Sequence, residues 1–499
     1  MSRTVVVGSG ISGLTVAALL AKAGRQVLVL EKKPLAGGAL HRFKRRKIPF
    51  DVGFHYTGNL GPGDITRRLW RYLGVEPLVA ITPFPQDGHD HLQIHGRSQP
   101  VQASFSYRRL TAHLKEQFPG EQGAIDRYFA VIQEICAQIP FYNLDLPLTP
   151  FLQGMGSRHQ PLAAFLDSLT SNQELQAVFA LPTFLYGVPV SRARLDVHAM
   201  VAHSYYMGAY TVAGGGQAIV DAHLKILARY GAEVRTSAAV EAIVDDGRRV
   251  SGVLVDGEFI AGTDLIFTGH PTAMLDLVNR DFFRPAYTSR LRELENTMSM
   301  YALFGRLPAG AAQEALQWRN YYSLPPGPAE FHDFMGCSPA QRQLMMSSPG
   351  ARDSQPLSAG GEGVILLAPA HWQEVARFHD STPRNRSAAY GAFKEEVAAR
   401  MIGHAARTWG AGYGAIEPLA VGTPLTFRDE LSAPQGSCYG AMYCLGQYNP
   451  GVRTRLPGLW LSGQSTLMTG VVGAALGALV TAGEMTGLEG LWEEVRQCP

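Results

Sequence analysis

Thr4-Val-Val-Val7 is followed at once by Gly8-Ser-Gly10-Ile-Ser-Gly13, and then by an alanine- and leucine-rich run that ends at Ala23. The valine run is typical of a buried strand, and the run after the glycines is typical of a buried helix. Gly8 permits a tight turn, Gly10 lets a pyrophosphate approach the backbone, and Gly13 lets the helix pack closely on the strand. This stretch therefore predicts a strand, turn and helix that bind a dinucleotide.

The next segment completes this unit. Gln26 to Leu30 gives a second apolar strand that leads into Glu31, 18 residues beyond Gly13. A carboxylate at this place can accept hydrogen bonds from the ribose hydroxyls of an adenosine, and it would repel a 2′-phosphate. The N–H groups of Ile11 and Ser12, at the start of the helix, are expected to hold the anionic pyrophosphate.

Composition limits the function classes. The chain has 499 residues, of which 46% are hydrophobic, enough for two or three domains' worth of core. Its 44 basic and 42 acidic residues give a net charge of +2, so nucleic acid is not an expected partner. The five cysteines are few, odd in number and scattered, which suits a reducing cytoplasm.

Membrane attachment has little support in the sequence. The most apolar runs are broken by glycines and polar residues, and the first strand begins at Thr4, so we expect neither a spanning helix nor a signal peptide. The basic run Lys44-Arg45-Arg46-Lys47 could touch acidic headgroups, but a solvated hairpin tip is the better interpretation. The expectation is a cytoplasmic protein, and peripheral membrane contact is compatible with it.

The nucleotide-binding unit is expected to be discontinuous. A second piece begins at Gly214-Gly215-Gly216, with a helix over 218–230 and short strands over 232–235, 240–244, 250–255 and 265–268. A strand and turn over 458–463, followed by a helix over 471–482, closes it. The predicted domains are therefore residues 1–65, 208–285 and 449–499 for the nucleotide, and 66–207 and 286–448 for the substrate. Residues 66–207 have a mainly helical pattern.

Several motifs together resemble the FAD-dependent phytoene desaturase superfamily, and within it the retinol saturase and carotenoid isomerase branch. They lie in order along nearly the whole chain: the glycine fingerprint with Glu31, Gly37-Gly38, Phe50-Asp51-Val52-Gly53-Phe54-His55-Tyr56, Gly214-Gly215-Gly216-Gln217, Thr423-Pro-Leu-Thr426, Gly436-Ser-Cys-Tyr439-Gly440, and Pro457-Gly458-Leu-Trp-Leu-Ser-Gly463-Gln464. The resemblance implies an α/β fold of the glutathione-reductase and amine-oxidase type. A Rossmann-like FAD-binding domain would carry a discontinuous α+β substrate domain.

The resemblance also implies a set of FAD contacts. The loop around Gly37 and Gly38 would lie near the phosphates and ribityl chain, and the N–H groups at the start of the last helix would face the pyrimidine edge of the flavin and stabilise negative charge there. The implied FAD-binding residues are Gly8, Gly10, Ile11, Ser12, Gly13, Glu31, Lys32, Gly37, Gly38, Ala39, Gly53, Phe54, His55, Val240, Gly463, Gln464, Gly470, Val471 and Val472.

The candidate catalytic residues are His55 and Tyr439. His55 follows the element that the family places near the isoalloxazine, and an imidazole that titrates near neutrality suits proton transfer. Tyr439 is a candidate for lining the flavin cavity, and a structural role in the core stays open for both residues.

No metal site is predicted. His89, His91 and His95 alternate with Asp90, Leu92 and Ile94, and the alternation of a strand explains this pattern without a metal.

These observations predict a flavoenzyme that acts on conjugated C=C bonds of an apolar polyene or isoprenoid by saturation, desaturation, isomerisation or reductive cyclisation. There is one persuasive dinucleotide fingerprint, so electrons are expected to come from, or go to, an external partner. Two alternatives stay open. An FAD-dependent amine oxidase is less favoured because Ala39, and not arginine, follows Gly37-Gly38. A non-enzymatic prenyl or polyene binder of the GDP-dissociation-inhibitor type has no need for a complete phosphate loop and Glu31.

Overall fold

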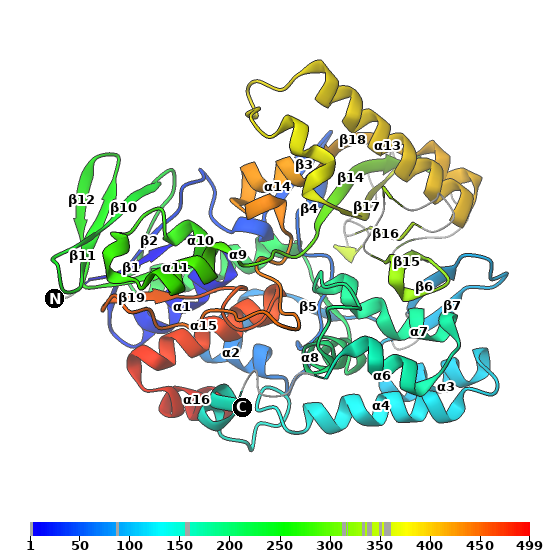
Figure 1. Ribbon diagram of the computed structural model, residues 1–499, viewed down its shortest axis with the longest axis horizontal. Helices are drawn as coiled ribbons and strands as arrows, with labels where there is room; N and C mark the ends of the chain where they lie inside the picture. The colour runs from blue at the N-terminus through cyan, green and yellow to red at the C-terminus, as the bar shows by residue number, and fades with distance from the viewer. Residues whose placement is uncertain are drawn as a thin grey trace.

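A five-stranded parallel sheet forms around the strand that opens the chain (Figure 1). The computed structural model describes residues 3–85, 89–154, 160–311, 316, 318–331, 335–336, 342–348, 352–353 and 361–499. The strand order is β19-β13-β1-β2-β9, and each neighbouring pair is parallel. The strands are β1 (Arg3–Val7), β2 (Gln26–Leu30), β9 (Glu233–Arg235), β13 (Asp264–Phe267) and β19 (Leu459–Leu461).

The first strand, turn and helix form as the sequence predicts. Val5 and Val6 are fully buried in β1, where Val5 pairs with Leu28 on one side and Leu265 on the other. Helix α1 (Ile11–Lys22) is buried on nearly every side, which explains its lack of a polar face. The predicted Rossmann-like α/β fold is confirmed.

Three separate parts of the chain supply this sheet and the helices against it. Helix α1 packs against α9 (Gly215–Arg229) and α15 (Gly470–Thr486), so the start, middle and end of the chain meet here. The helix that the sequence placed at 218–230 begins three residues earlier, at Gly215, whose φ is +63°. The exact domain boundaries stay a prediction.

A small antiparallel sheet of three strands adjoins the nucleotide sheet and lies to the left in Figure 1. Its strands are β10 (Val240–Asp245), β11 (Val250–Val255) and β12 (Glu258–Ala261). Their apolar residues form a core together with Leu28, Leu30 and Leu265 of the parallel sheet. This small sheet therefore shares a buried face with the nucleotide-binding layer.

A second, larger sheet has the order β18-β14-β17-β16-β15-β6-β7, and all its pairs are antiparallel except β15 with β6. Its strands are β6 (His89–Ile94), β7 (Val101–Ser104), β14 (Ser299–Leu307), β15 (Arg319–Leu324), β16 (Leu344–Ser347), β17 (Glu362–Ala370) and β18 (Glu417–Gly422). Helix α13 (Ala388–Trp409) packs against this sheet and shares an apolar core with it. The predicted α+β character of the substrate region is present.

Residues 66–207 are less uniformly helical than predicted. Strands β6 and β7 extend the larger sheet, and β5 (Ile81–Pro83) pairs with β8 (Tyr210–Val212). The strand β6 agrees with the alternation of residues 89–95 in the sequence, whereas β5 and β7 were not predicted because they are short and lie between helices. The helices here are α2 (Ile65–Leu73), α3 (Tyr107–Gln117), α4 (Gln122–Cys136), α5 (Leu148–Gly154), α6 (Leu162–Leu169), α7 (Gln173–Ala180) and α8 (Leu195–Tyr206).

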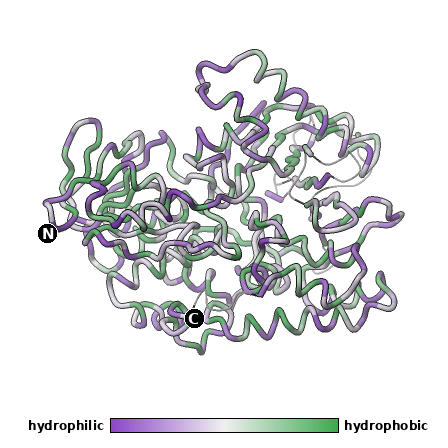
Figure 2. The backbone as a smooth tube through the Cα atoms, viewed as in Figure 1, coloured by the Kyte–Doolittle hydropathy of each residue, from purple (hydrophilic) through white to green (hydrophobic). Residues whose placement is uncertain are grey.

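The remaining helices lie at the periphery of the two sheets. They are α10 (Pro271–Met274), α11 (Pro285–Arg292), α12 (Trp372–Val375), α14 (Pro424–Leu431) and α16 (Leu488–Arg496). Figure 2 shows hydrophobic residues concentrated along the inner strands and helices and hydrophilic residues along outer turns. The apolar share of the sequence is thus used for buried layers.

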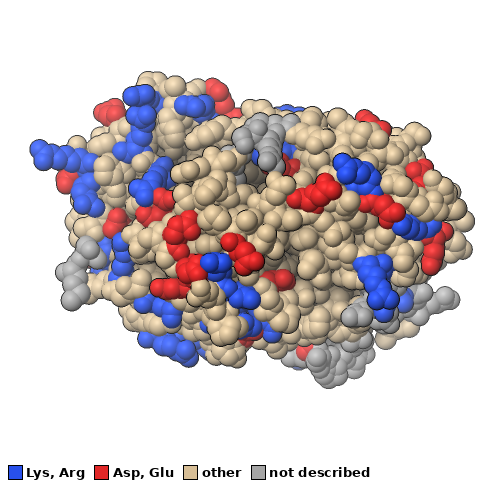
Figure 3. Space-filling view, turned by 90° about the horizontal axis from the view of Figure 1, so that it is seen from below, with Lys and Arg blue, Asp and Glu red and all other residues tan. Residues whose placement is uncertain are grey.

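The surface agrees with the balanced charge of the chain. On the face in Figure 3, basic and acidic side chains are interspersed among uncharged ones. The run over 44–47 lies at the exposed turn between β3 (Arg42–Arg45) and β4 (Ile48–Asp51), as predicted for a hairpin tip. Within the described residues, every helix is too short or too polar to cross a bilayer.

Candidate functional site

The carboxyl ends of the parallel strands define one edge of the nucleotide sheet. Val7, Leu30, Phe267 and Leu461 end their strands at this edge, and in sheets of this type ligands bind there. The residues that follow these strands include the predicted contacts Gly8, Glu31 and Gly463. The fold therefore brings together three segments that are far apart in sequence.

The glycine turn has the shape that a phosphate group needs. Gly8 has a φ of +103°, and its N–H donates to the carbonyl of Leu30 at 2.8 Å. A Cβ on Gly13 would overlap the carbonyl oxygen of Gly8, so glycine is required there for close packing. A Cβ on Gly10 would meet no atom within 4 Å. The space in front of the α1 N-terminus is thus open, and the helix offers free N–H groups to an anion there.

Glu31 holds the turn as well as facing the predicted ribose site. Its Oε2 accepts from the N–H of Ser9 at 3.0 Å and from the Ser9 hydroxyl at 2.6 Å, and its Oε1 accepts from the N–H of Lys33 at 2.9 Å. A carboxylate has about four acceptor positions, so capacity remains for a ribose hydroxyl. Burial lowers the pKa of the neighbouring Lys32.

The loop at Gly37 and Gly38 returns to the glycine turn, as the resemblance implies. A Cβ on Gly38 would stand 3.4 Å from the Cα of Gly10, and the N–H of Gly37 donates to the Ser9 hydroxyl at 3.1 Å. Ala39 in turn contacts the next predicted segment, because a Cβ on Gly53 would stand 3.1 Å from its carbonyl oxygen. Gly10, Gly38, Ala39 and Gly53 therefore lie close together.

A buried ion pair that the sequence argument did not assign fixes this arrangement. Asp51 pairs with Arg42 at 2.7 Å, and its Oδ1 accepts from the N–H of Gly216 at 3.2 Å, which ties β4 to the start of α9. Arg42 also pairs with Asp353. Burial raises the pKa of the Asp51 carboxyl, and the hydrogen bond and charge of Arg42 oppose that shift. The signal was present, since Asp51 and Gly216 both belong to motifs of the resemblance.

The end of the chain reaches the same edge. The hydroxyls of Ser12 and Ser462 share a hydrogen bond of 2.8 Å, directly before Gly463. Arg25, after the end of α1, donates to the carbonyl of Met485 near the end of α15 at 3.0 Å, so the two helices run in the same direction. Helix α15 has 17 residues and α1 has 12. Because Ser462 contacts Ser12, the segment that leads into α15 lies beside the start of α1.

The predicted residues at the start of α15 fit an approaching ring system. Gly470 has a φ of +76°, and a Cβ on it would meet no atom within 4 Å. Val471 and Val472 are half-buried in the first turn, which carries no acidic residue. A helix N-terminus of this kind stabilises negative charge. The residues present therefore fit the flavin that the resemblance implies.

Val240 lies beside the adenosine end of the predicted site. It begins β10, two residues after Ala238, whose N–H donates to the carbonyl of Glu31 at 2.8 Å. The role of Val240 and those of the other predicted contacts stay predictions. Gly8, Glu31 and Gly463 follow strands of the nucleotide sheet at its carboxyl edge.

His55 is less suited to acid catalysis than expected. Phe54 is buried, and His55 follows it with an Nδ1 that has no hydrogen-bond partner among the described residues. Burial, and then the charge of Arg352, lowers the pKa of His55 to about 4. Desolvation disfavours the charged form of this imidazole, and the catalytic role of His55 stays a prediction.

Tyr439 lies close to the predicted ribityl contact. The N–H of Tyr439 donates to the Thr297 hydroxyl at 3.0 Å, and a Cβ on the next residue, Gly440, would stand 3.2 Å from Cγ of Gln464. Its ring packs against Gly187, where a Cβ would stand 2.9 Å from it. Burial raises the pKa of the Tyr439 phenol, so it stays neutral. The lining role of Tyr439 in the flavin cavity and its catalytic role both stay predictions.

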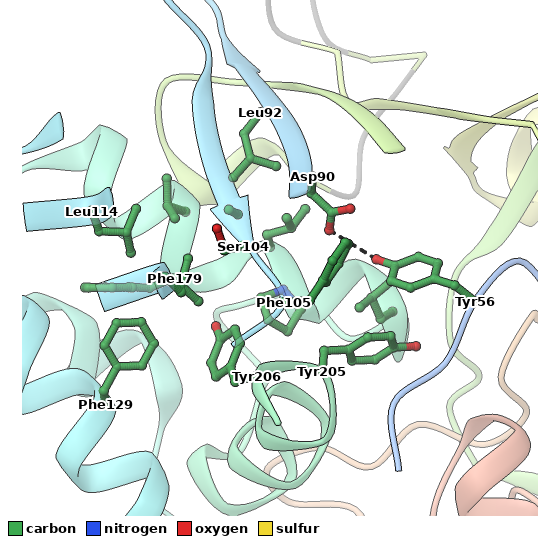
Figure 4. Close-up of a pocket in the computed structure, with 16 residues that line it drawn as sticks. Tyr56, Asp90, Leu92, Ser104, Phe105, Leu114, Phe129, Phe179, Tyr205 and Tyr206 are labelled. Atoms are coloured by element: carbon green, nitrogen blue, oxygen red, sulfur yellow. Dashed lines mark hydrogen bonds between the residues drawn. The ribbon is translucent and has the colours of Figure 1, made fainter. Parts of the chain in front are cut away.

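An apolar cavity of about 50 Å³ lies between β6, β7 and the helices α3, α4, α7 and α8 (Figure 4). We call it the β6 cavity. It is lined by Tyr56, Asp90, Leu92, Ala103, Ser104, Phe105, Leu110, Leu114, Phe129, Val178, Phe179, Leu181, Pro182, Leu185, Tyr205 and Tyr206. In Figure 4, Tyr56 and Tyr205 lie at one side and Leu114 and Phe129 at the other. Asp90 is the carboxyl among these lining residues.

Asp90 belongs to a buried polar cluster that sequence reasoning missed. Its Oδ1 accepts from Asn320 at 2.8 Å, and its Oδ2 accepts from the Tyr56 hydroxyl at 3.3 Å. The Tyr56 hydroxyl also shares a hydrogen bond of 2.9 Å with that of Tyr322. Burial raises the pKa of Asp90 to about 7, against the hydrogen bonds and the charge of Arg352. The signal was a carboxylate on the same strand face as Leu92 and Ile94.

Comparisons with known proteins agree with this geometry. Residues 6–73 match a family described as an NAD(P)-binding Rossmann-like domain. All-trans-retinol 13,14-reductase of Macaca fascicularis is 27% identical over 533 residues, covering 95% of this chain and 84% of that protein. A 4,4'-diapophytoene desaturase of Staphylococcus haemolyticus is 21% identical, with 98% of both chains covered. Prolycopene isomerase of Arabidopsis thaliana is 25% identical, covering 99% and 84%.

A solved structure supports the fold. Putrescine oxidase bound to putrescine superposes with a TM-score of 0.65 at 14% identity, covering 97% of this chain and 98% of that one. The sequence relatives, together with this fold, indicate an oxidoreductase with a flavin or other nucleotide cofactor. The resemblance to the phytoene desaturase superfamily, and to its retinol saturase and carotenoid isomerase branch, is confirmed.

Proposed function

We propose that this protein binds FAD and uses it to reduce a C=C bond of an apolar conjugated polyene. The observation that carries the proposal is the position of the β6 cavity. Tyr56 lines this cavity and directly follows the loop over 53–55, which is predicted to contact the flavin. The cavity otherwise offers mainly leucine, phenylalanine and other apolar side chains, which favour an apolar ligand.

We choose FAD because of residues that lie along the carboxyl edge of the nucleotide sheet. The open space at Gly10 and the position of Glu31 directly after β2 support a pyrophosphate and a ribose at this edge. The predicted contacts at the start of α15 support a flavin ring at the far end of the dinucleotide. Bound FAD would supply hydride transfer to and from carbon. The chain's own residues would bind the ribose and phosphates, orient the ring, and keep water from the apolar substrate.

The choice of a polyene rests on the cavity and on the relatives. The relatives that align over nearly the whole chain include a retinol reductase, a diapophytoene desaturase and a prolycopene isomerase. A cavity of about 50 Å³ accepts a small group, so a long ligand would place only one end in it. We assign the reductive direction because several relatives that align over 95% of this chain are all-trans-retinol 13,14-reductases.

The experiment is a pair of anaerobic incubations of the purified protein with a panel of retinoids and carotenoids, one with chemically reduced flavin and one with oxidised flavin. A product heavier by two hydrogens supports saturation. A lighter product would identify a desaturase, and an isomer of unchanged mass would identify an isomerase. In a separate aerobic incubation with oxidised flavin, peroxide formation from small amines, without conversion of any polyene, would identify the amine oxidase alternative.

A further inference from the structure

Asp90 is placed unusually for a carboxyl group. It lies in β6 with 7% of its surface exposed, and it lines a cavity whose other walls are mostly aliphatic and aromatic. Figure 4 shows its carboxyl directed toward the Tyr56 hydroxyl at the edge of that cavity. A buried acid without a strong ion pair is costly to keep charged, so its protonated form is favoured in this place.

The surroundings also stabilise the form that has lost its proton. Asn320 donates to Oδ1 and Tyr56 donates to Oδ2, and the positive charge of Arg352 acts on the carboxylate. Arg352 is held by its bond to the Asn320 side chain at 2.7 Å and by the carbonyl of His55 at 3.1 Å. Burial and these partners oppose each other, and the pKa of Asp90 is about 7. Such a group both holds and releases a proton at neutral pH.

Asp90 contacts Tyr56, the residue that directly follows the predicted flavin-binding loop over 53–55. Tyr56 follows His55 directly, and its hydroxyl contacts Asp90. The ring of Tyr205 packs on the ring of Tyr56 with a centroid separation of 5.1 Å, so these two rings and Asp90 form the loop-facing side of the β6 cavity.

We propose that Asp90 is the proton donor in the reduction. This inference rests on the proposed function. One carbon of the double bond receives a hydride, with two electrons, from the reduced flavin. The other carbon receives the proton of the Asp90 carboxyl. The C=C π bond and the carboxyl O–H bond break, two C–H bonds form, and the carboxylate regains a proton from water. An external electron donor reduces the flavin again.

The other charged and titratable groups that face Asp90 do not change charge near neutrality. The tyrosines are kept neutral because burial raises each pKa far above its usual value, and burial holds the pKa of Arg352 near 10. These groups are Tyr56, Tyr205, Tyr322 and Arg352. His55 is neutral because its pKa is about 4. Among these groups, Asp90 is the one whose pKa lies between 6 and 8.

The first test is a single turnover. Flavin-loaded protein is reduced anaerobically and mixed with all-trans-retinol at pH values from 5.5 to 8.5, and flavin reoxidation is followed by absorbance. The wild-type rate should fall as pH rises through about 7, because the proton donor becomes ionised. Asp90→Asn should be slower by about 10²- to 10⁴-fold and should lose this pH dependence. Asp64→Asn is the control, because Asp64 is another partly buried carboxyl that accepts from the N–H of Gly61, outside the cluster.

Two further measurements distinguish the loss of a proton donor from a folding defect in Asp90→Asn. Tyr56→Phe removes one hydrogen bond to the Asp90 carboxylate, so the fall in rate should move to higher pH. In flavin-free protein, infrared spectroscopy should show a protonated carboxyl band that disappears through about pH 7 in the wild type and is absent from Asp90→Asn.

The outcomes separate the two proposals. If the wild type is reoxidised by retinol and Asp90→Asn retains its rate and pH profile, the inference is wrong and the proposed function stands. An unchanged profile in Tyr56→Phe, or an unchanged infrared band in Asp90→Asn, would also overturn the inference. If no retinoid or carotenoid reoxidises the wild type, the proposed function fails, and the inference fails with it.

Discussion

Ser12 and Ser462 lie 450 positions apart in the chain, yet their buried hydroxyls share a hydrogen bond of 2.8 Å. This contact joins the first helix to the segment that leads into the last long helix. It sets the distance between the phosphate turn and the second group of predicted flavin contacts. The C-terminal part of the chain therefore forms one side of the predicted cofactor site.

Removal of either serine should weaken this junction. We expect Ser12→Ala and Ser462→Ala each to lower the free energy of unfolding by about 0.5–1.5 kcal/mol, because each leaves a buried hydroxyl unpaired. The double variant should cost less than the two single costs added together, because the second substitution removes the orphaned partner. Urea unfolding of all four proteins measures this coupling. Strict additivity would show that the two hydroxyls do not interact.

Gly13 should not tolerate a side chain. Its Cβ would overlap the carbonyl oxygen of Gly8, so Gly13→Ala must force α1 away from β1. We expect a loss of about 1–3 kcal/mol in the free energy of unfolding. Gly123→Ala is a matched control on a helix, since a Cβ there meets no atom within 4 Å. Equal stability of the two variants would contradict the close packing described here.

Substitutions at Gly10 should separate the effect of side-chain volume from the effect of negative charge on FAD binding. A Cβ at Gly10 meets no atom within 4 Å, so Gly10→Ala should fold normally. Gly10→Glu places a carboxylate where the pyrophosphate is expected, and FAD affinity should fall by at least about tenfold, or about 1.4 kcal/mol. The ratio of bound flavin to purified protein measures the effect. A glutamate variant that retains a full complement of flavin would place the phosphate elsewhere.

Asp90 should make the protein less stable as pH rises. Its pKa is raised to about 7 in the folded state, whereas an unfolded aspartate ionises near pH 4. Between these values the folded state binds more protons than the unfolded state, so this group stabilises the fold at low pH, and the stabilisation is lost as pH rises through about 7. The effect should be roughly 1–4 kcal/mol.

The comparison with Asp90→Asn isolates this term from the buried histidines, whose lowered pKa values act in the opposite direction. His198, for example, has a pKa of about 3 because of burial, so it destabilises the fold as pH falls. Urea unfolding at pH 4.5, 6 and 8 should show the wild type losing stability relative to Asp90→Asn as pH rises. A constant difference between the two proteins would mean that Asp90 does not titrate in this range.

The sequence was sufficient for the nucleotide-binding half because its determinants are local. A valine strand, three glycines and an apolar helix specify one another within twenty residues, and Glu31 follows at a fixed spacing. The second half of the site follows from motifs near the chain end. The Asp90 cluster could not be assembled in this way, because it depends on β6 lying beside β15 in a parallel pair. Such pairing joins residues that are 230 positions apart.

The low pKa of His55 could not be predicted from the sequence either. An imidazole in a loop has an ordinary pKa unless its burial is known, and here burial lowers it to about 4. The same physical effect acts in the other direction on Asp90, whose pKa it raises to about 7. Desolvation thus makes the aspartate, and not the predicted histidine, the group that can exchange a proton near neutrality.

The most direct test of the central claim is the mass of the product formed from all-trans-retinol by the FAD-loaded protein under anaerobic conditions, with an excess of chemical reductant. We expect a product two hydrogens heavier than the substrate, formed only when the flavin is reduced. Full loading with FAD and complete reduction, with every retinoid and carotenoid of the panel recovered unchanged, would contradict it.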